Sequence, residues 1–598
     1  MNGLLNEITE KGFLMDKTRK ESEPVKKVRL PIGQSDFRKI IEGGFDFVDK
    51  SDFIPAVLRG AAEVILITRP RRFGKTLNMS MLRCFFAPEV QKQPTKDLFK
   101  GLKVSKEGED ILQHQGKYPV IFLTFKDLKE DSFETAYKNI YQLILEVYEE
   151  FSYLLESSSL SNRQKDFFEY ILKRKADQSE IANSLKTLTS FLFQHHGVKP
   201  MILIDEYDTP IQSGYLQGYY NEVIAFFRKF FGTSLKDNPC LFKAVLTGIL
   251  RVSRESLFSG LNNLKVHSVL HPQLSSFFGF TEDEVNQLLN KTGFQGKADD
   301  IKHWYNGYQM GDTVLYNPWS IVNCIEDGGV LKPFWVNTSD NILIKDLLLK
   351  SSVNFKDKFE TLLHGTPVER VVDENFVFPD LQKNRESAIW SLLLMTGYLT
   401  VRACEETNRG PVCQLAIPNQ EIRNLYQVII ERWLANGYGL EWYEEFLNHL
   451  LNGDMEEFQS GLHHIMEHIV SVHDVGKKEP ESFYHGFMIG LTASLAGDKR
   501  YETRSNRESG YGRYDYLILA RDPNKLSILL EFKQVPLPTG KKETEKMQAT
   551  LDKAAQEALQ QINQQVYFAE IQQRGLTNIL KIGLAFSGKR FGMASERE

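Results

Sequence analysis

The sequence predicts an α/β protein with an N-terminal parallel sheet, a helical lid and middle region, and a C-terminal α/β domain. The stretch VILITRPRRFGKTLNMSML at 64–82 has the pattern of a strand, a basic loop and a helix. Apolar runs of strand length follow at 120–124, 201–204 and 241–247, separated by helical patterns. Strands that alternate with helices indicate a parallel sheet, with ligands at the carboxyl ends of its strands.

The chain has 598 residues, too many for one core, because chains divide into domains beyond about 250–300 residues. We expect a polar arm over 1–27, a first domain over 28–280, a helical lid over 281–333, a mostly helical middle region over 334–475 and a C-terminal domain over 476–598. The lid is predicted from short helical patterns and the aromatic turns WYNGY and YNPW.

The composition predicts a soluble, cytoplasmic protein. A net charge of −5 argues against a nucleic-acid partner bound through overall charge, but it is compatible with a local basic site. The five cysteines form no C-x-x-C pair, so we interpret them as reduced thiols. The sequence has neither a signal-peptide core nor an apolar run near the roughly 20 residues of a membrane-spanning helix. We therefore expect no membrane partner.

The loop after the first strand ends like a phosphate-binding motif. Gly74, Lys75 and Thr76 match the end of G-x-x-x-x-G-K-[ST], but Arg69 replaces the first glycine. A helix N-terminus offers unpaired N–H groups to an anion, Lys75 would reach the β and γ phosphates of ATP, and Thr76 would bind Mg²⁺. The alternative is a basic turn without a ligand. The predicted nucleotide contacts are Arg69, Arg72, Phe73, Gly74, Lys75, Thr76 and Leu77.

The apolar run at 201–204 ends in two carboxylates, Asp205 and Glu206. In a Walker B arrangement Asp205 would organise Mg²⁺ and Glu206 would polarise the attacking water. The alternative is an acidic strand end that caps the next turn. The GKT motif upstream favours the catalytic interpretation.

The run at 241–247 ends in Thr247 and is followed by Arg251 and Arg254. Thr247 could sense the γ-phosphate from the strand tip, and the arginines could contact the nucleotide or a neighbouring subunit of a homo-oligomer. A turn and a solvated basic face are the alternatives.

A second constellation lies near the C-terminus. Asp515 falls on a predicted strand at 514–520, and Glu531 and Lys533 fall on the next one at 527–533. Alternate side chains share a face of a strand, so Glu531 and Lys533 point the same way and Asp515 can converge on them. Two carboxylates that bind Mg²⁺ and a lysine that positions water are what phosphodiester cleavage requires.

Other residues could complete this pattern. Gln561 lies off the apolar stripe of a predicted helix and could support the site. Glu481 and Glu508 are both candidates for a further glutamate. The alternative interpretation of the E-x-K pattern is a surface salt bridge.

Several motifs together carry a family resemblance. TRPRRFGKT, LIDEYDTP, LTGILRVSRESLFSGLNNL, FFGFTEDEV, WYNGY and YNPWSI resemble the prokaryotic AAA-ATPase-like family, and the likeness covers most of the chain. The resemblance implies a P-loop ATPase of the AAA+ or STAND kind, in which an arginine at position 69 is usual. It also implies a C-terminal domain of the PD-(D/E)xK nuclease superfamily, with a restriction-endonuclease-like fold. Asp515, Glu531, Lys533 and Gln561 match that superfamily's pattern.

We therefore expect an ATP-hydrolysing protein whose nucleotide state regulates a Mg²⁺-dependent nuclease acting on DNA or RNA. One alternative is a STAND-type signalling or scaffold ATPase whose C-terminal domain binds nucleic acid without cleaving it. Another is that the C-terminal fold only holds the chain together.

Overall fold

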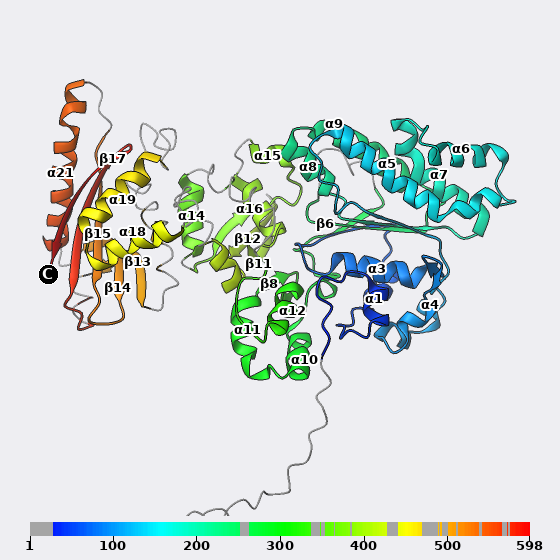
Figure 1. The fold of residues 1–598 in the computed structure, drawn as a ribbon, viewed down its shortest axis with the longest axis horizontal. Helices are drawn as coiled ribbons and strands as arrows, with labels where there is room; N and C mark the ends of the chain where they lie inside the picture. The colour runs from blue at the N-terminus through cyan, green and yellow to red at the C-terminus, as the bar shows by residue number, and fades with distance from the viewer. Residues whose placement is uncertain are drawn as a thin grey trace, which may run out of the picture.

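The computed structural model describes residues 28–251, 262–335, 347, 353–363, 365–382, 386–408, 410–426, 440–468, 488, 491–492, 495, 500–509, 512–536, 541–564, 571 and 574–598. The predicted arm over 1–27, Arg254 and Glu481 lie outside these residues. Figure 1 shows an N-terminal unit, a lid with the middle region, and a C-terminal unit along the longest axis of the molecule.

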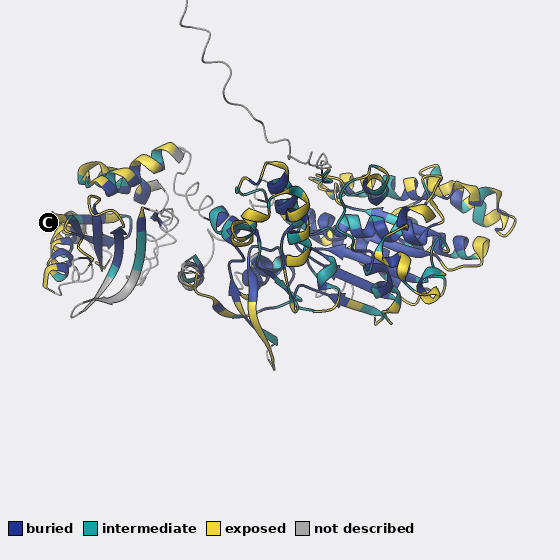
Figure 2. Ribbon diagram, turned by 90° about the horizontal axis from the view of Figure 1, so that it is seen from below, coloured by how far each residue is buried: buried dark blue, intermediate teal, exposed yellow. Residues whose placement is uncertain are grey.

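The N-terminal unit is built on a parallel sheet with the strand order β4 (Val120–Thr124), β5 (Met201–Asp205), β6 (Lys243–Gly248), β1 (Val64–Thr68) and β7 (Leu264–His267). β1, β5 and β6 are buried along their whole length, which explains their continuous apolar runs (Figure 2). We did not predict β7, because its short sequence LKVH lies at the sheet edge and includes polar residues. Since β6 lies between β1 and β5, the ends of these three strands meet.

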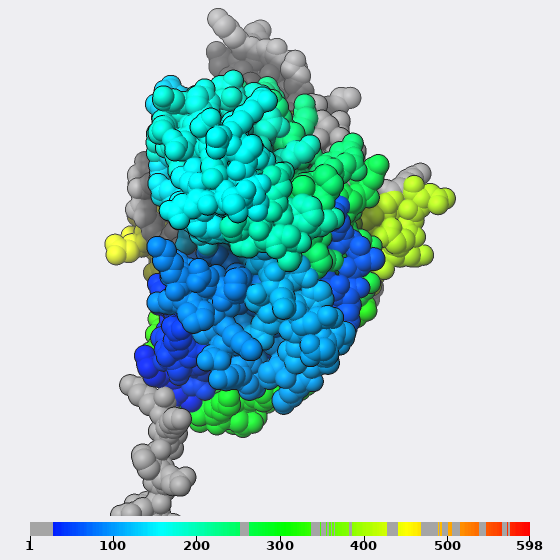
Figure 3. Space-filling model, turned by 90° about the vertical axis from the view of Figure 1, so that its right-hand side faces the viewer, coloured from blue at the N-terminus to red at the C-terminus, as the bar shows by residue number. Residues whose placement is uncertain are grey.

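Helices cover both faces of this sheet. α1 (Phe37–Glu42) and α3 (Lys75–Phe86) lie on one face, and α5 (Phe133–Glu150), α7 (Gln178–His196) and α9 (Tyr220–Leu235) lie on the other (Figure 1). In the end-on view of Figure 3, the segment in cyan that includes α5 and α7 lies over the earlier segment in blue. The unit also contains α2 (Phe53–Arg59), α4 (Glu109–Leu112), α6 (Asn162–Leu172) and α8 (Thr209–Gln217).

The lid consists of short helices around a small core of their own, and of a hairpin whose buried residues Tyr308, Met310 and Leu315 belong to the core of the N-terminal unit. A glycine in its WYNGY turn, Gly307, has φ +116°, and a Cβ there would lie 2.1 Å from the carbonyl oxygen of Pro418. This close approach requires glycine and packs the lid against the middle region. The lid elements are α10 (Glu282–Thr292), α11 (Ala298–Tyr305), β8 (Tyr308–Met310), β9 (Thr313–Leu315) and α12 (Pro318–Glu326).

The middle region contains a sheet where we expected mostly helix. Its antiparallel strands have the order β10-β12-β11, and its elements follow one another as helix, strand, two helices and two strands, which is the topology of a winged helix. We call residues 353–426 the winged-helix unit. We did not predict β11 and β12, because charged residues and a proline interrupt their apolar pattern. The elements are α14 (Val353–Leu363), β10 (Val368–Val371), α15 (Phe378–Gln382), α16 (Glu386–Met395), β11 (Thr400–Thr407) and β12 (Gly410–Ala416).

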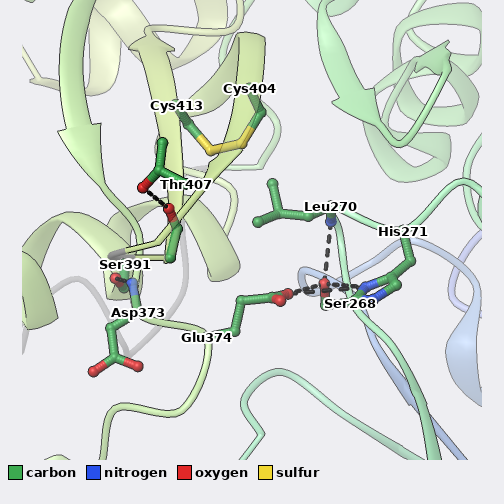
Figure 4. The surroundings of a disulfide bond; sticks show 10 residues. Ser268, Leu270, His271, Asp373, Glu374, Ser391, Cys404, Thr407 and Cys413 are labelled. Carbon is green, nitrogen blue, oxygen red and sulfur yellow. Dashed lines mark hydrogen bonds and ion pairs between the residues drawn. A yellow bond between two sulfur atoms is a disulfide. The ribbon is translucent and has the colours of Figure 1, made fainter.

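A disulfide joins two adjacent strands of this unit. Cys404 on β11 pairs directly with Cys413 on β12, with Cα atoms 4.0 Å apart (Figure 4). The expectation of five reduced thiols is therefore wrong for these two cysteines, while Cys84, Cys240 and Cys324 are free. The sequence did not reveal the pair because strand register, which sets the two residues opposite each other, is not a local property.

The C-terminal unit is a sheet with helices on both faces. The strand order is β13 (Tyr501–Ser509), β14 (Gly512–Ala520), β15 (Ser527–Gln534), β16 (Ile579–Ser587) and β17 (Arg590–Arg597). β15 and β16 run parallel, and the other neighbouring pairs run antiparallel.

Helices from two parts of the chain cover this second sheet. α21 (Lys541–Gln564) shares one core with β15 and β16, and α18 (Leu440–Asn452) and α19 (Met455–His468) share another with the opposite face. We expected α18 and α19 to belong to the middle region. The amphipathic pattern of each predicts a helix, but it does not indicate which surface that helix covers. None of the helices that the structure describes is both long and apolar enough to cross a membrane.

Gly397→Ala should destabilise the winged-helix unit more than Gly410→Ala. Both glycines have positive φ, so each alanine costs about 1 kcal/mol or more. A Cβ on Gly397 would also lie 3.0 Å from the side chain of Pro70, whereas nothing lies within 4 Å of a Cβ on Gly410. Urea denaturation of both variants measures the difference. If both variants lose the same free energy of unfolding, Gly397 is not closely packed against Pro70.

Candidate functional site

The loop between β1 and α3 turns sharply into the helix. Gly74 is the N-cap residue of α3 with φ +83°, and Arg72 has φ +65°. These left-handed conformations aim the first N–H groups of α3 at the space beside the loop, where an anion would be held.

Lys75 lies at the centre of this loop and is only 3% exposed. Its Nζ donates to the carbonyl oxygens of Arg69 at 3.0 Å and Pro70 at 3.1 Å. It also forms an ion pair of 3.2 Å with Glu206 Oε1. The predicted Walker A lysine and Walker B glutamate are therefore in direct contact.

Asp205, at the end of β5, is fully buried and gathers hydroxyl groups from three elements. Thr76 Oγ1 on α3 donates to Oδ2 at 2.8 Å, and Thr247 Oγ1 on β6 donates to Oδ1 at 2.6 Å. Thr124 Oγ1 on β4 lies 3.4 Å from Oδ2. Burial, and then the neighbouring Glu206, raise the pKa of Asp205, while the threonine hydrogen bonds oppose the rise.

Glu206 has φ +53°, which is an uncommon conformation for a residue with a side chain. Such strain concentrates at functional sites, where the surrounding structure holds it in place. Here the strained turn points the carboxylate back at Lys75.

Arg69, which replaces the first Walker glycine, points away from the helix N-terminus. Its guanidinium is fully buried and donates to the carbonyl oxygens of Thr68 at 2.8 Å and His267 at 2.9 Å. Burial lowers the pKa of Arg69 to about 9. In this structure Arg69 ties β1 to β7, and it does not line the cavity beside the loop.

A cavity of about 340 Å³ opens beside the loop, a size within the usual range of ligand pockets. Its walls come from the loop at 72–77, the N-terminal segments 30–35 and 46–48, and lid residues that include Trp319. The Arg72 guanidinium lies 4.3 Å from the centre of the Trp319 ring. Arg72 to Leu77, predicted as nucleotide contacts, thus all face one cavity.

Two further residues predicted to contact the nucleotide, Phe73 and Arg251, differ in their position relative to the cavity. Phe73 lines the cavity but is fully buried, and its ring packs edge-on against Tyr308 at 5.0 Å. Arg251 is half-buried at the end of the described segment after β6. It does not line the cavity.

In the C-terminal unit the two predicted carboxylates come from neighbouring strands. Tyr516 pairs with Leu530, so Asp515 on β14 lies beside the part of β15 that carries Glu531. Asp515 Oδ2 accepts a 2.8 Å hydrogen bond from the Phe532 N–H. Burial raises the pKa of Asp515, and this hydrogen bond opposes the rise.

Helix α21 supplies partners for the other two predicted residues of this cluster. Gln561 Nε2 donates to Glu531 Oε1, so Gln561 lies beside the cluster that we expected it to support. Lys533 Nζ lies 3.6 Å from Glu557 Oε2, so the structure places the lysine next to an acid that we did not predict.

The structure describes neither of the two side chains that we considered for a further glutamate. Glu508 lies on β13, but its side chain is outside what the structure describes, as is the whole of Glu481. Within the described part of the chain, no three His, Cys, Asp or Glu side chains are grouped to hold a metal ion. A metal here would rely on Asp515, Glu531 and ligands such as backbone carbonyls or water.

Comparison with known families agrees with the two units. A family model described as predicted AAA-ATPase matches residues 31–258, and a model of the PD-(D/E)XK nuclease superfamily matches residues 479–596. The chain carries an AAA-ATPase-like domain followed by a PD-(D/E)XK nuclease superfamily domain. It is also similar to an uncharacterised protein in the vnfD 5′ region of Azotobacter chroococcum mcd 1, with 25% identity over 564 residues that cover 94% of this chain and 96% of that protein.

Sequence reasoning missed two buried polar residues of the AAA-ATPase-like domain. Asp208 accepts hydrogen bonds of 2.8 Å from the N–H groups of Ile249 and Leu250, and burial raises its pKa to about 6. Lys50 lines the cavity and pairs with Glu284 of the lid at 2.6 Å. The motif DEYD hinted at Asp208, but no local pattern points to Lys50.

Thr247→Val should lower the free energy of unfolding of the AAA-ATPase-like domain by about 1–3 kcal/mol. Valine keeps the shape but leaves the buried Asp205 Oδ1 without its 2.6 Å donor. Thr247→Ser keeps the hydroxyl and serves as the control. Urea denaturation followed by tryptophan fluorescence measures both variants. If Thr247→Ser and Thr247→Val lower the free energy of unfolding equally, the hydrogen bond to Asp205 does not stabilise the domain.

Proposed function

We propose that the AAA-ATPase-like domain binds and hydrolyses ATP with Mg²⁺, and that its nucleotide state regulates a Mg²⁺-dependent nuclease site on DNA or RNA in the C-terminal domain. One observation carries the first part: Lys75, Thr76, Asp205, Glu206 and Thr247 converge at one edge of the sheet, beside a cavity. We further propose a cytoplasmic protein that can form homo-oligomers.

The residues at this edge suit phosphoryl transfer. Thr76 and Asp205 offer adjacent oxygens for a divalent cation, and Lys75 can exchange its loop carbonyls for phosphate oxygens. Once phosphate holds Lys75, the Glu206 carboxylate is released to orient the attacking water. Bound Mg²⁺ would neutralise phosphate charge here and activate water at the C-terminal site.

The C-terminal cluster suits phosphodiester hydrolysis. Asp515 and Glu531 are each held by a specific donor, the Phe532 N–H and the Gln561 amide, so the two carboxylates are fixed before a cation arrives. Lys533 is bound to Glu557 through a long contact, and a phosphate could displace it. The lysine would then steady the charge that develops in the transition state.

A second candidate is a STAND-type switch whose C-terminal domain binds nucleic acid without cleaving it. The ion pair between Lys75 and Glu206 favours it, because a lysine already neutralised by a carboxylate suits slow turnover. Assembly that depends on ATP, combined with undetectable hydrolysis, would identify this candidate.

Lys75→Ala should lower ATP turnover by roughly 10²–10³-fold, the usual cost of losing one donor to transition-state charge. Phosphate release from purified protein with Mg²⁺ and ATP measures it. Lys96→Ala removes an exposed lysine of the same domain and should behave as the wild type. Turnover that persists in Lys75→Ala would refute the N-terminal assignment.

Lys533→Ala should reduce cleavage of DNA or RNA by a similar factor, roughly 10²-fold or more, and leave ATP turnover intact. Gel analysis of mixed nucleic acids incubated with Mg²⁺ and ATP measures it. The matched control is Lys525→Ala, an exposed lysine in the turn before β15. Cleavage at the wild-type rate in Lys533→Ala would exclude the proposed nuclease site.

A further inference from the structure

Glu421 is a fully buried carboxylate where the lid meets the winged-helix unit. It lies in the helical segment 420–426 after β12. Its oxygens accept hydrogen bonds from Ser320 Oγ of α12 at 2.8 Å, the Phe334 N–H at 2.7 Å and the Trp335 N–H at 2.9 Å. A buried charge with this many donors fixes the groups around it.

The residues that Glu421 holds also contact the nucleotide loop. The carbonyl oxygen of Phe334 accepts from Arg72 Nη1 at 3.1 Å and from Trp319 Nε1 at 3.1 Å. Trp335 Nε1 lies 3.4 Å from the carbonyl oxygen of Arg71. The segment of Phe334 and Trp335 therefore lies between Glu421 and the loop.

One peptide group transmits the interaction. The Phe334 carbonyl and the Trp335 N–H belong to the same planar amide. Glu421 binds its N–H edge, and Arg72 and Trp319 bind its carbonyl edge. A negative charge on one edge and a positive charge on the other polarise the amide and strengthen both contacts. Arg72 and Trp319 both line the cavity.

We propose that Glu421 is a positioning residue for nucleotide binding, which holds Arg72 and Trp319 in the cavity wall through the peptide between Phe334 and Trp335. This inference rests on the proposed nucleotide site. It assigns the winged-helix unit, which supplies Glu421, a part in setting nucleotide affinity.

The charge of Glu421 responds to pH near neutrality. Burial raises the pKa of Glu421 to about 7, and its hydrogen-bond donors and Arg72 oppose the rise. Among the residues that the structure describes, the other titratable groups that interact with it are Tyr305, Tyr308 and Cys324. Burial raises the pKa of each of these three, so they stay neutral near pH 7. Below about pH 7 Glu421 takes up a proton, its attraction for Arg72 is lost, and nucleotide affinity falls.

The test compares Glu421→Gln with Glu374→Gln in the full chain. Glu374 joins the same winged-helix unit to Ser268, directly after β7 (Figure 4), and neither residue lines the cavity. The dissociation constant of a fluorescent ADP analogue with Mg²⁺ is measured from pH 6 to pH 8. Titration of the ligand's own phosphate is common to all variants, so differences from the wild type report on the protein.

At pH 8 Glu421→Gln should weaken binding roughly tenfold, and the difference from the wild type should vanish toward pH 6. Glu374→Gln should follow the wild type throughout. Wild-type affinity in Glu421→Gln at pH 8, or equal losses in both variants, would overturn the inference. If the wild type itself binds no nucleotide, the proposed function fails instead.

A second variant covers the case in which Glu421→Gln does not fold. Ser320→Ala removes one donor to Glu421 and leaves the charge in place. It should raise the pKa of Glu421 and move the midpoint of the affinity profile to higher pH. An unchanged profile in Ser320→Ala would also count against the inference.

Discussion

The buried carboxylate of Asp205 joins three elements that are far apart in the sequence. Thr76 opens α3, Thr124 ends β4 and Thr247 lies near the end of β6, and their hydroxyl groups all lie within 3.4 Å of its oxygens. Removing a carboxylate from water is costly, and hydroxyl donors offset part of that cost. This interaction therefore organises the carboxyl edge of the sheet.

Packing around the loop between β1 and α3 joins the winged-helix unit to the N-terminal unit. Gly397 approaches Pro70 in the loop, Gly307 of the lid approaches Pro418, and one hydrophobic core runs from the first sheet to Tyr426. α16 is buried from Ala388 to Met395, and these residues belong to the same core.

The nuclease superfamily domain is built around a sheet that is covered on both faces. It has two cores of its own, on opposite faces of its sheet, and α21 brings Gln561 and Glu557 to the strand that carries Glu531 and Lys533. A helix packed on the sheet thus contacts the side chains that β15 presents. These two cores are separate from the core that the first sheet shares with the winged-helix unit.

The sequence by itself predicted which residues meet at each of the two candidate sites. Lys75 and Thr76 follow a strand at fixed spacing, Asp205 and Glu206 end another, and Asp515 and Glu531 lie on adjacent strands, so local patterns sufficed. Tertiary structure alone decided what each group touches. Arg69 faces β7 rather than the cavity, and Glu421 is buried against the lid. Cys404 lies opposite Cys413 on the neighbouring strand. Burial and register depend on contacts between distant segments, and no local pattern encodes them.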